Sequence, residues 1–397
     1  MNILFDQTEA QTLFYNGAAE YAQSVFFKMI SLLKEYPDVN IYSLYHSGKR
    51  FRYEQLSCES LRQYERVFPV DYKNETLKDI VKKYDIDLSF ITCAQSFCDL
   101  PVGDLQNIGC KVISVIHDLC DEETEKTRLL HFQYLCHPLK LVRLYMSRLK
   151  TRLMSGNFQI RSRQMIGMLN NNNADIITVS DYSRKSIIYN YPQLHNRIHV
   201  LASPAKKINT IQGNIKNNVL KSLIDKKERY FLLLSADRVL KNAERTIHAF
   251  NTFNQLYNMG YKLVTIGWGK KEFDNHIPLP FLSAEDLEMA YMHCHALIYP
   301  SLFEGFGYPP LEAMKYSKPI LCSNVCSMPE ILGRAPIYFS PIYETDIFKA
   351  LVEFTEASYN ELSKRCFKQY QEVSEKQIKD LDILVRSIMN GTFLTKN

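Results

Sequence analysis

The chain has 397 residues, of which 46% are hydrophobic, 12% aromatic and 23% charged, a composition typical of a globular protein with two domains. Its formal net charge of +5 is a mild excess, and no apolar run approaches the roughly 20 residues that a membrane-spanning helix needs. Asp6 interrupts the region where a signal peptide would have its apolar core, so we expect a cytoplasmic protein.

The ten cysteines show no disulfide framework. Several lie inside apolar, strand-like runs such as "GCKVISVIHDLC", which favours reduced, buried thiols. Cys322-x3-Cys326 and the "HCH" at 293–295 raise a zinc site as an alternative, but neither spacing matches a zinc ribbon or finger. We therefore expect no metal and no cofactor.

Short apolar runs alternate with amphipathic stretches along the chain, which is the pattern of βαβ units and parallel sheets. The first half predicts strands at 1–5, 39–45, 87–93, 111–117 and 174–180, and a helix at 18–36. The second half predicts strands at 229–236, 261–267, 295–301 and 318–324, and helices at 242–260 and 283–294. We therefore predict an α/β fold with two Rossmann-like, doubly wound domains that face a cleft.

A polar stretch rich in lysine and asparagine, residues 203–229, is the expected connection between the two domains. We predict a first domain at 1–205, a second at 206–375, and a C-terminal helix at 376–397 that can cross back to the first domain. In such sheets ligands bind outside the carboxyl ends of the strands, so the loops that follow strands are the places to look for chemistry.

The segment 301–314, "SLFEGFGYPPLEAM", follows a predicted strand and places Glu304 and Glu312 eight positions apart. Its two glycines let backbone amides approach a ligand closely, and its two prolines suit the first turn of a helix. The amino end of that helix favours phosphate, whereas carboxylates suit sugar hydroxyls, so the residues indicate a nucleotide sugar. An alternative stays open here, in which Glu312 only complements the helix dipole and Glu304 is a solvated loop residue.

The same segment resembles the Glu-x7-Glu motif of retaining, family 4-type glycosyltransferases with the GT-B fold, also called glycosyl transferases group 1. Residues 318–341, "KPILCSNVCSMPEILGRAPIYFSP", continue like this family. The resemblance implies that Glu304 contacts the transferred sugar as a catalytic residue and that Glu312 holds the ribose. The second domain would then bind the nucleotide sugar, and the first would lie on the acceptor side.

Backbone amides and two cations complete the donor site that the resemblance implies. The amides of Phe306 and Gly307 would face the sugar, and those near Leu311 would face the phosphate. Arg238 and Lys241, in "SADRVLKNAERTIHAF", suit the growing negative charge of a departing diphosphate. This segment resembles the diphosphate-binding loop of the family, although Ser-Ala replaces the usual Gly-Arg pair.

Further positions resemble the family more loosely. Gly267, in "LVTIGWGKK", matches a Gly-x-Gly strand end near the nucleotide, and Gly17, in "FYNGAAEYAQSVFFKM", matches a loop near the donor phosphate. His117, at the end of "VISVIHDL", would orient or deprotonate an acceptor hydroxyl, unless it is only a structural residue. "VSDYSRKSI", 179–187, matches a Val-Ser-x-x-Ser segment, in which we expect Ser183 to cap the next helix.

A basic segment from Lys126 to Ala174 contains nine Lys or Arg residues and no Asp or Glu. Within it, 138–154 interleaves arginines with a helical apolar face, a pattern typical of contact with an anionic membrane surface or a lipid-linked acceptor. Ordinary packing on the first domain is the main alternative. Nucleic acid is the least favoured partner, because no recognition motif accompanies the charge.

Together these features predict a retaining glycosyltransferase of polysaccharide or glycoconjugate biosynthesis, peripheral on the inner face of a membrane. It would move a sugar from a nucleotide-sugar donor to a hydroxyl of a glycan or lipid-linked acceptor. The alternative from another class is a catalytically inactive scaffold that keeps the donor site. A sugar-nucleotide epimerase and a nucleic-acid-binding protein are weaker rivals.

Overall fold

The computed structural model of this chain describes residues 1–11, 17–51, 54–94, 105, 107–120, 122–123, 163–206 and 215–392. The chain divides into two compact units, the first made of Met1–Lys207 with Lys376–Asn397 and the second of Ile208–Glu375. Both units are α/β, with parallel sheets and helices between the strands. None of the helices in the described part combines the length and the apolar character that a membrane span requires.

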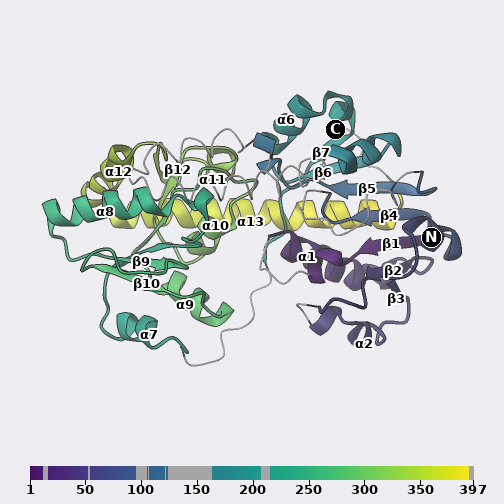
Figure 1. The fold of residues 1–397 in the computed structure, drawn as a ribbon, viewed down its shortest axis with the longest axis horizontal. Helices are drawn as coiled ribbons and strands as arrows, with labels where there is room; N and C mark the ends of the chain where they lie inside the picture. The colour runs from purple at the N-terminus through teal and green to yellow at the C-terminus, as the bar shows by residue number, and fades with distance from the viewer. Residues whose placement is uncertain are drawn as a thin grey trace, which may run out of the picture. The chain divides into compact units, whose positions relative to one another are not determined.

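Seven parallel strands in the described part of the first unit form one sheet, in the order β3-β2-β1-β4-β5-β6-β7 (Figure 1). The strands are β1 (Asn2–Asp6), β2 (Asn40–Tyr45), β3 (Val67–Asp71), β4 (Leu88–Ile91), β5 (Lys111–Val115), β6 (Asp175–Thr178) and β7 (Ile198–Val200). The helices are α1 (Gly17–Leu32), α2 (Cys58–Leu61), α3 (Leu77–Lys83) and α6 (Asp181–Asn190), with 3₁₀ turns η1 (Thr8–Gln11), η2 (Leu33–Glu35), η3 (Glu54–Leu56) and η6 (Pro192–Arg197). β4 is buried at every position, as expected of a central parallel strand covered on both faces.

The second unit holds a six-stranded parallel sheet in its described residues, in the order β10-β9-β8-β11-β12-β13. Figure 1 labels β9, β10 and β12 of this sheet. The strands are β8 (Tyr230–Leu233), β9 (Lys262–Ile266), β10 (His276–Leu279), β11 (Ala296–Tyr299), β12 (Ile320–Ser323) and β13 (Ile337–Phe339). The helices are α7 (Asn218–Asp225), α8 (Ala243–Tyr257), α9 (Ala284–His293), α10 (Tyr308–Met314), α11 (Met328–Leu332) and α12 (Glu344–Glu356), with the 3₁₀ turn η7 (Val239–Lys241). Packing of α8 and α12 over one another buries an aromatic core around Phe231, Phe250 and Phe354.

A long last helix, α13 (Tyr359–Met389), begins in the second unit and ends in the first. Its final residues are tied to the first unit by polar contacts. Asp380 accepts a hydrogen bond from the backbone N–H of Ala202 (2.7 Å), and the Gln377 amide donates to the Ser203 carbonyl (2.6 Å). On the surface, Asp382 pairs with Lys28 (2.8 Å). Because the first two contacts satisfy buried polar groups, they hold this helix end on the first unit.

The helix that follows β6 begins one turn earlier than expected. The expectation that Ser183 caps it is wrong, because Ser180 is the N-cap and its hydroxyl accepts from the N–H of Ser183 (3.1 Å). Ser183 instead lies inside the first turn of α6, where its hydroxyl donates to the carbonyl of His117 (3.0 Å). The Val-Ser-x-x-Ser segment thus fixes the loop that carries His117.

Candidate functional site

The two loops of the expected donor site meet where the strand order of the second sheet reverses. β8 and β11 are neighbours there, with β9 on one side and β12 on the other. In open α/β sheets this switch point is where ligands bind, outside the carboxyl ends of the strands. The N–H of Leu302, after β11, donates to the carbonyl of Leu240, after β8 (2.8 Å), so the two loops are joined directly.

Lys241 reaches across this junction. It lies at the end of η7 in the loop after β8, and its ammonium donates hydrogen bonds to Glu304 Oε1 and to the hydroxyl of Tyr299 (2.9 Å). The Lys241 and Glu304 side chains are only 11% and 14% exposed. The structure therefore brings the expected cation and the expected catalytic carboxylate into one largely buried ion pair.

The loop that carries Glu304 is fixed by serine hydroxyls. Ser301 donates to the Glu304 carboxylate, Ser327 donates to the Glu304 carbonyl (2.9 Å), and Ser323 donates to the Ser301 carbonyl (2.7 Å). Burial by itself would raise the pKa of Glu304, but the Lys241 ammonium and the hydroxyl donors hold that pKa below its ordinary value. Glu304 is thus kept ionised, so it can accept hydrogen bonds.

Glu312 lies one turn into α10, where its carboxylate accepts a hydrogen bond from the hydroxyl of Tyr291 (2.5 Å). Tyr291 itself is buried on α9, so it sets the direction of the Glu312 side chain. Phe306 and Leu311 have buried side chains as well. The amide roles that the resemblance implies for them stay predictions.

Gly307 has a structural task that sequence reasoning did not assign. It is the N-cap of α10 and has φ of +87°, in the left-handed region that favours glycine. A Cβ atom added there would lie 2.3 Å from Cε and 2.8 Å from Sδ of Met328. This glycine therefore turns the chain into α10 and lets that helix start close to α11.

Replacing Gly307 with alanine is expected to lower the free energy of unfolding by about 2–3 kcal/mol, because it adds left-handed strain and overpacking. Chemical denaturation measures this directly. Gly269→Ala is the matched control, because a Cβ there meets no atom within 4 Å and φ is not in the left-handed region. Equal unfolding free energies for the two variants would contradict the structural role of Gly307.

Arg238 and Gly267 lie in the loops after β8 and β9. Arg238 is exposed, and its guanidinium has no hydrogen-bond or ion-pair partner among the residues that the structure describes. Gly267 has φ of +90°, so the chain turns sharply at the end of β9. The structure thus leaves one expected cation exposed, whereas the other, Lys241, is paired.

Two expected residues belong to the first unit. His117 follows β5 and is half-buried, with Nε2 3.2 Å from the carbonyl of Thr92 and its ring 5.0 Å from that of Tyr21. Burial lowers the pKa of His117 to about 4. The ring is therefore neutral at neutral pH, and because a carbonyl only accepts, the proton resides on Nε2. Gly17 is the first residue of α1 and is half-buried.

The structure describes only part of the basic segment 126–174. Its expected membrane-facing stretch, 138–154, lies outside the described residues. The described end, from 163 onward, packs Met165, Ile166 and Leu169 into the core of the first unit. That end of the segment therefore serves ordinary packing.

Two of the residues that suggested zinc, Cys294 and His295, are packed in the second unit, whereas His293 is exposed. The ring of His295 stacks on that of Tyr359 with centroids 4.7 Å apart, and burial raises the pKa of Cys294 to about 12. Across the described ranges, no three His, Cys, Asp or Glu side chains gather into a group that could hold a metal ion.

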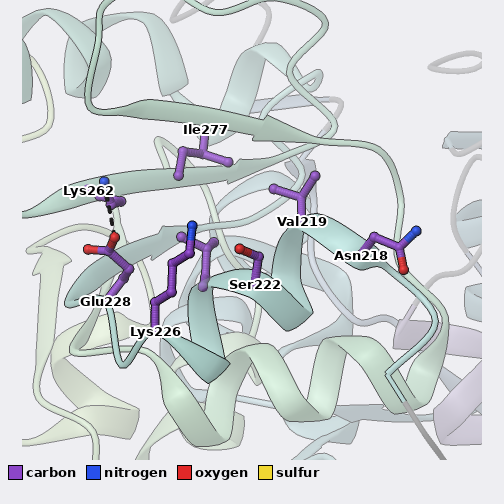
Figure 2. Close-up of a pocket in the computed structure, with 8 residues that line it drawn as sticks. Asn218, Val219, Ser222, Lys226, Glu228, Lys262 and Ile277 are labelled. Carbon is purple, nitrogen blue, oxygen red and sulfur yellow. Dashed lines mark ion pairs between the residues drawn. The ribbon is translucent and has the colours of Figure 1, made fainter.

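A shallow cavity of about 360 Å³ lies at the other edge of the second sheet (Figure 2). It is bordered by Ser222 of α7, by Lys226 directly after that helix, by Ile277 of β10, and by the ion pair of Glu228 with Lys262 (3.6 Å). Lys262 begins β9 and Glu228 precedes β8, so this is the amino-terminal edge of those strands. None of the expected site residues lines this cavity.

Comparison with known families bears on the whole second unit. Residues 214–366 match the model of the family described as "Glycosyl transferases group 1". The matched stretch includes the Lys241–Glu304 pair, Glu312, Arg238 and Gly267, so each of these lies in the part of the chain that is similar to this family.

Curated relatives are similar to part of the chain. O-antigen chain mannosyltransferase B of Escherichia coli is 31% identical over 191 residues, covering 42% of this chain and 47% of the relative. O-antigen chain mannosyltransferase RfbU of Salmonella typhimurium is 28% identical over 180 residues, covering 42% and 46%. The chain thus aligns with less than half the length of these relatives.

Solved structures extend the likeness to both units. WaaG, a glycosyltransferase involved in lipopolysaccharide biosynthesis, has a TM-score of 0.59 at 13% identity, covering 96% of this chain and 99% of WaaG. Alr3699/HepE of Anabaena in complex with UDP-glucose has a TM-score of 0.59 at 12% identity, covering 98% and 99%. At these identities the likeness shows the fold alone, which is GT-B, as the glycosyl transferases group 1 resemblance predicted.

Sequence reasoning missed the tyrosines and serines that hold the two glutamates. Tyr299 ends β11 and Tyr291 lies within α9, and both read as ordinary apolar positions. Ser327 gave a weak signal, because it lies in the stretch "SNVCSMPEILG" that resembles the glycosyl transferases group 1 pattern. Each fixes a glutamate that the sequence had identified.

Proposed function

We propose that the chain is a retaining glycosyltransferase of polysaccharide or glycoconjugate biosynthesis. It moves a sugar from a nucleotide-sugar donor to a hydroxyl of a glycan or lipid-linked acceptor. The mannosyltransferase relatives favour mannose as the sugar. The observation that carries the proposal is the largely buried Lys241–Glu304 pair at the sheet switch point, eight residues before the Glu312 carboxylate.

A nucleotide sugar offers a partner to each member of this pair. Its diphosphate accepts charge-assisted hydrogen bonds from the Lys241 ammonium, and its sugar hydroxyls donate to the Glu304 carboxylate. The exposed guanidinium of Arg238 adds a second cation. When a donor that carries both a diphosphate and a sugar binds, the Lys241–Glu304 ion pair is therefore replaced by charge-assisted hydrogen bonds to the donor.

The chemical step follows from this placement. As the bond between the sugar and the diphosphate breaks, negative charge grows on the leaving oxygen, where Lys241, Arg238 and the amides near Leu311 stabilise it. Glu304 is hydrogen-bonded through Ser301 and Lys241, which suits it to hold the sugar. The acceptor hydroxyl then attacks on the face that the diphosphate leaves, which retains the anomeric configuration. His117, which the resemblance places near the acceptor, is neutral, and its role in the proposal is to orient an acceptor hydroxyl.

Glu312 is the residue for a test of donor binding, because its half-exposed carboxylate is proposed to hold the ribose. Thermal unfolding is measured with GDP-mannose, UDP-glucose, ADP-glucose and dTDP-glucose, since a ligand of the folded state raises the unfolding temperature. We expect one nucleotide class to stabilise the protein. Glu312→Gln is expected to weaken that ligand about 10-fold, as loss of a charged hydrogen bond implies.

Glu353→Gln is the matched control, because Glu353 is an exposed residue on α12 outside the site. It is expected to keep the full ligand-induced shift. A flat response to all four nucleotide sugars would contradict the proposed donor site. A response without any transfer or donor hydrolysis would favour the inactive scaffold.

A further inference from the structure

Three neighbouring strands of the second sheet, β8, β9 and β10, end in loops that place three unusual residues together. Gly267 directly follows β9, Asp237 lies in the loop after β8, and Phe281 lies just after β10. The proposed roles of Lys241, Glu304 and Glu312 make no use of Asp237 or Phe281. They are therefore candidates for another part of the ligand.

The geometry centres on Gly267. A Cβ atom added at this glycine would lie 3.0 Å from Asp237 Oδ1 and 3.3 Å from Phe281 Cζ. The carboxylate and the ring thus both pack close against the backbone of Gly267, where a side chain would keep them apart. With φ of +90°, this position is also one that a larger residue would fill only under strain.

Both side chains are exposed and have no internal partner. Phe281 is 69% exposed and makes no ring contact with another aromatic residue in the described part of the chain. Asp237 is exposed and has no hydrogen-bond or ion-pair partner among the described residues. A phenylalanine at a rigid strand end gains little stability in that position, whereas it offers a flat surface on which a planar ring can stack.

The carboxylate of Asp237 determines which nucleobase fits best. A carboxylate has two oxygens that accept hydrogen bonds and none that donate. Guanine presents two N–H donors, N1–H and the 2-amino group, on one edge. Uracil presents its single N–H between two carbonyl groups, which repel a carboxylate, and the N1 atom of adenine is an acceptor. Of these bases, guanine is the complement of Asp237.

We propose that Asp237 and Phe281 form the nucleobase subsite of the donor and that Asp237 selects guanine. This inference rests on the proposed donor site, because the neighbouring Arg238 then receives the diphosphate that is attached to the base. Phe281 supplies stacking for any base, and Asp237 supplies the specificity.

The test is calorimetric titration of the full chain with GDP, IDP, XDP, UDP and ADP. GDP is expected to bind the wild-type protein at least about 10-fold more tightly than IDP, which lacks the 2-amino group, and more tightly than UDP or ADP. Asp237→Asn is expected to weaken GDP by about 10–100-fold and to strengthen XDP, because the asparagine amide donates to the carbonyl that xanthine carries at C2. Phe281→Ala is expected to weaken all five ligands about 10-fold.

Asp274→Asn is the control, since Asp274 is a fully exposed residue of the same unit, 3.7 Å from Lys271. It is expected to leave every affinity unchanged. Tighter binding of UDP or ADP than of GDP by the wild-type protein would overturn this inference. So would a ratio of GDP to XDP affinity that is the same in Asp237→Asn as in the wild type. Either result would leave the proposed donor site standing. Absence of binding by all five ligands would overturn the donor site itself, and this inference with it.

Discussion

Glu304→Gln is expected to reduce glycosyl transfer by at least about 100-fold, because the reacting sugar loses its charged hydrogen-bond acceptor and Lys241 loses its counter-ion. The glutamine keeps the size of the side chain and one oxygen that can accept from Ser301. Binding of the free nucleoside diphosphate should therefore persist. The measurement is the rate of nucleoside diphosphate release from the preferred donor at saturation.

The same Glu353→Gln control is expected to keep the wild-type rate. A Glu304→Gln protein that also works at that rate would show that Glu304 is not part of the reacting centre. If the variant loses both transfer and diphosphate binding, unfolding measurements decide whether the fold was lost.

Lys241→Met is expected to lower the free energy of unfolding by about 3 kcal/mol, because it leaves the Glu304 carboxylate largely buried without its cation. The double variant Lys241→Met/Glu304→Gln is expected to recover most of this loss, since no unpaired charge remains. It is expected to stay inactive, because both groups that are proposed to bind the donor are gone. Chemical denaturation of the two single variants and the double variant gives the coupling free energy.

The loss of unfolding free energy in Lys241→Met is expected to depend on pH. The pKa of Glu304 in the folded protein lies below its ordinary value of 4.5, so the pair stabilises the folded state above that pH. The stabilisation is lost as the pH falls through the folded pKa. The difference in stability between wild type and Lys241→Met should therefore shrink in acid. A stability difference between wild type and Lys241→Met that grows in acid would contradict the ion pair. Additive effects of the two substitutions on the free energy of unfolding would contradict it as well.

The strands that were predicted from the sequence and the strands that were not differ in their position within the sheets. Every predicted strand is an interior strand, and the four that were not predicted, β3, β7, β10 and β13, are the sheet edges. Interior parallel strands are covered on both faces and read as apolar runs. Edge strands need less apolar surface and tolerate proline, as Pro69 in β3 and Pro278 in β10 illustrate.

The donor site was predicted residue by residue but not as a connected unit. Lys241 and Glu304 were each identified, yet their ion pair depends on β8 and β11 being neighbours, and local sequence does not state strand order. Gly307 was assigned to ligand approach, whereas its packing against Met328 appears only when α10 and α11 are placed. The ligand and catalytic roles of all the predicted site residues, His117 and Gly17 included, stay predictions.

The most direct measurement is a proton NMR time course of the full chain with its preferred nucleotide sugar, which follows the anomeric proton of the first product formed. A retaining reaction predicts release of the nucleoside diphosphate and a first product with the anomeric configuration of the donor, whether an acceptor hydroxyl or water attacks. A first product with the opposite configuration would contradict a retaining reaction. An unconsumed donor that binds tightly would contradict catalysis and leave a nucleotide-sugar-binding scaffold.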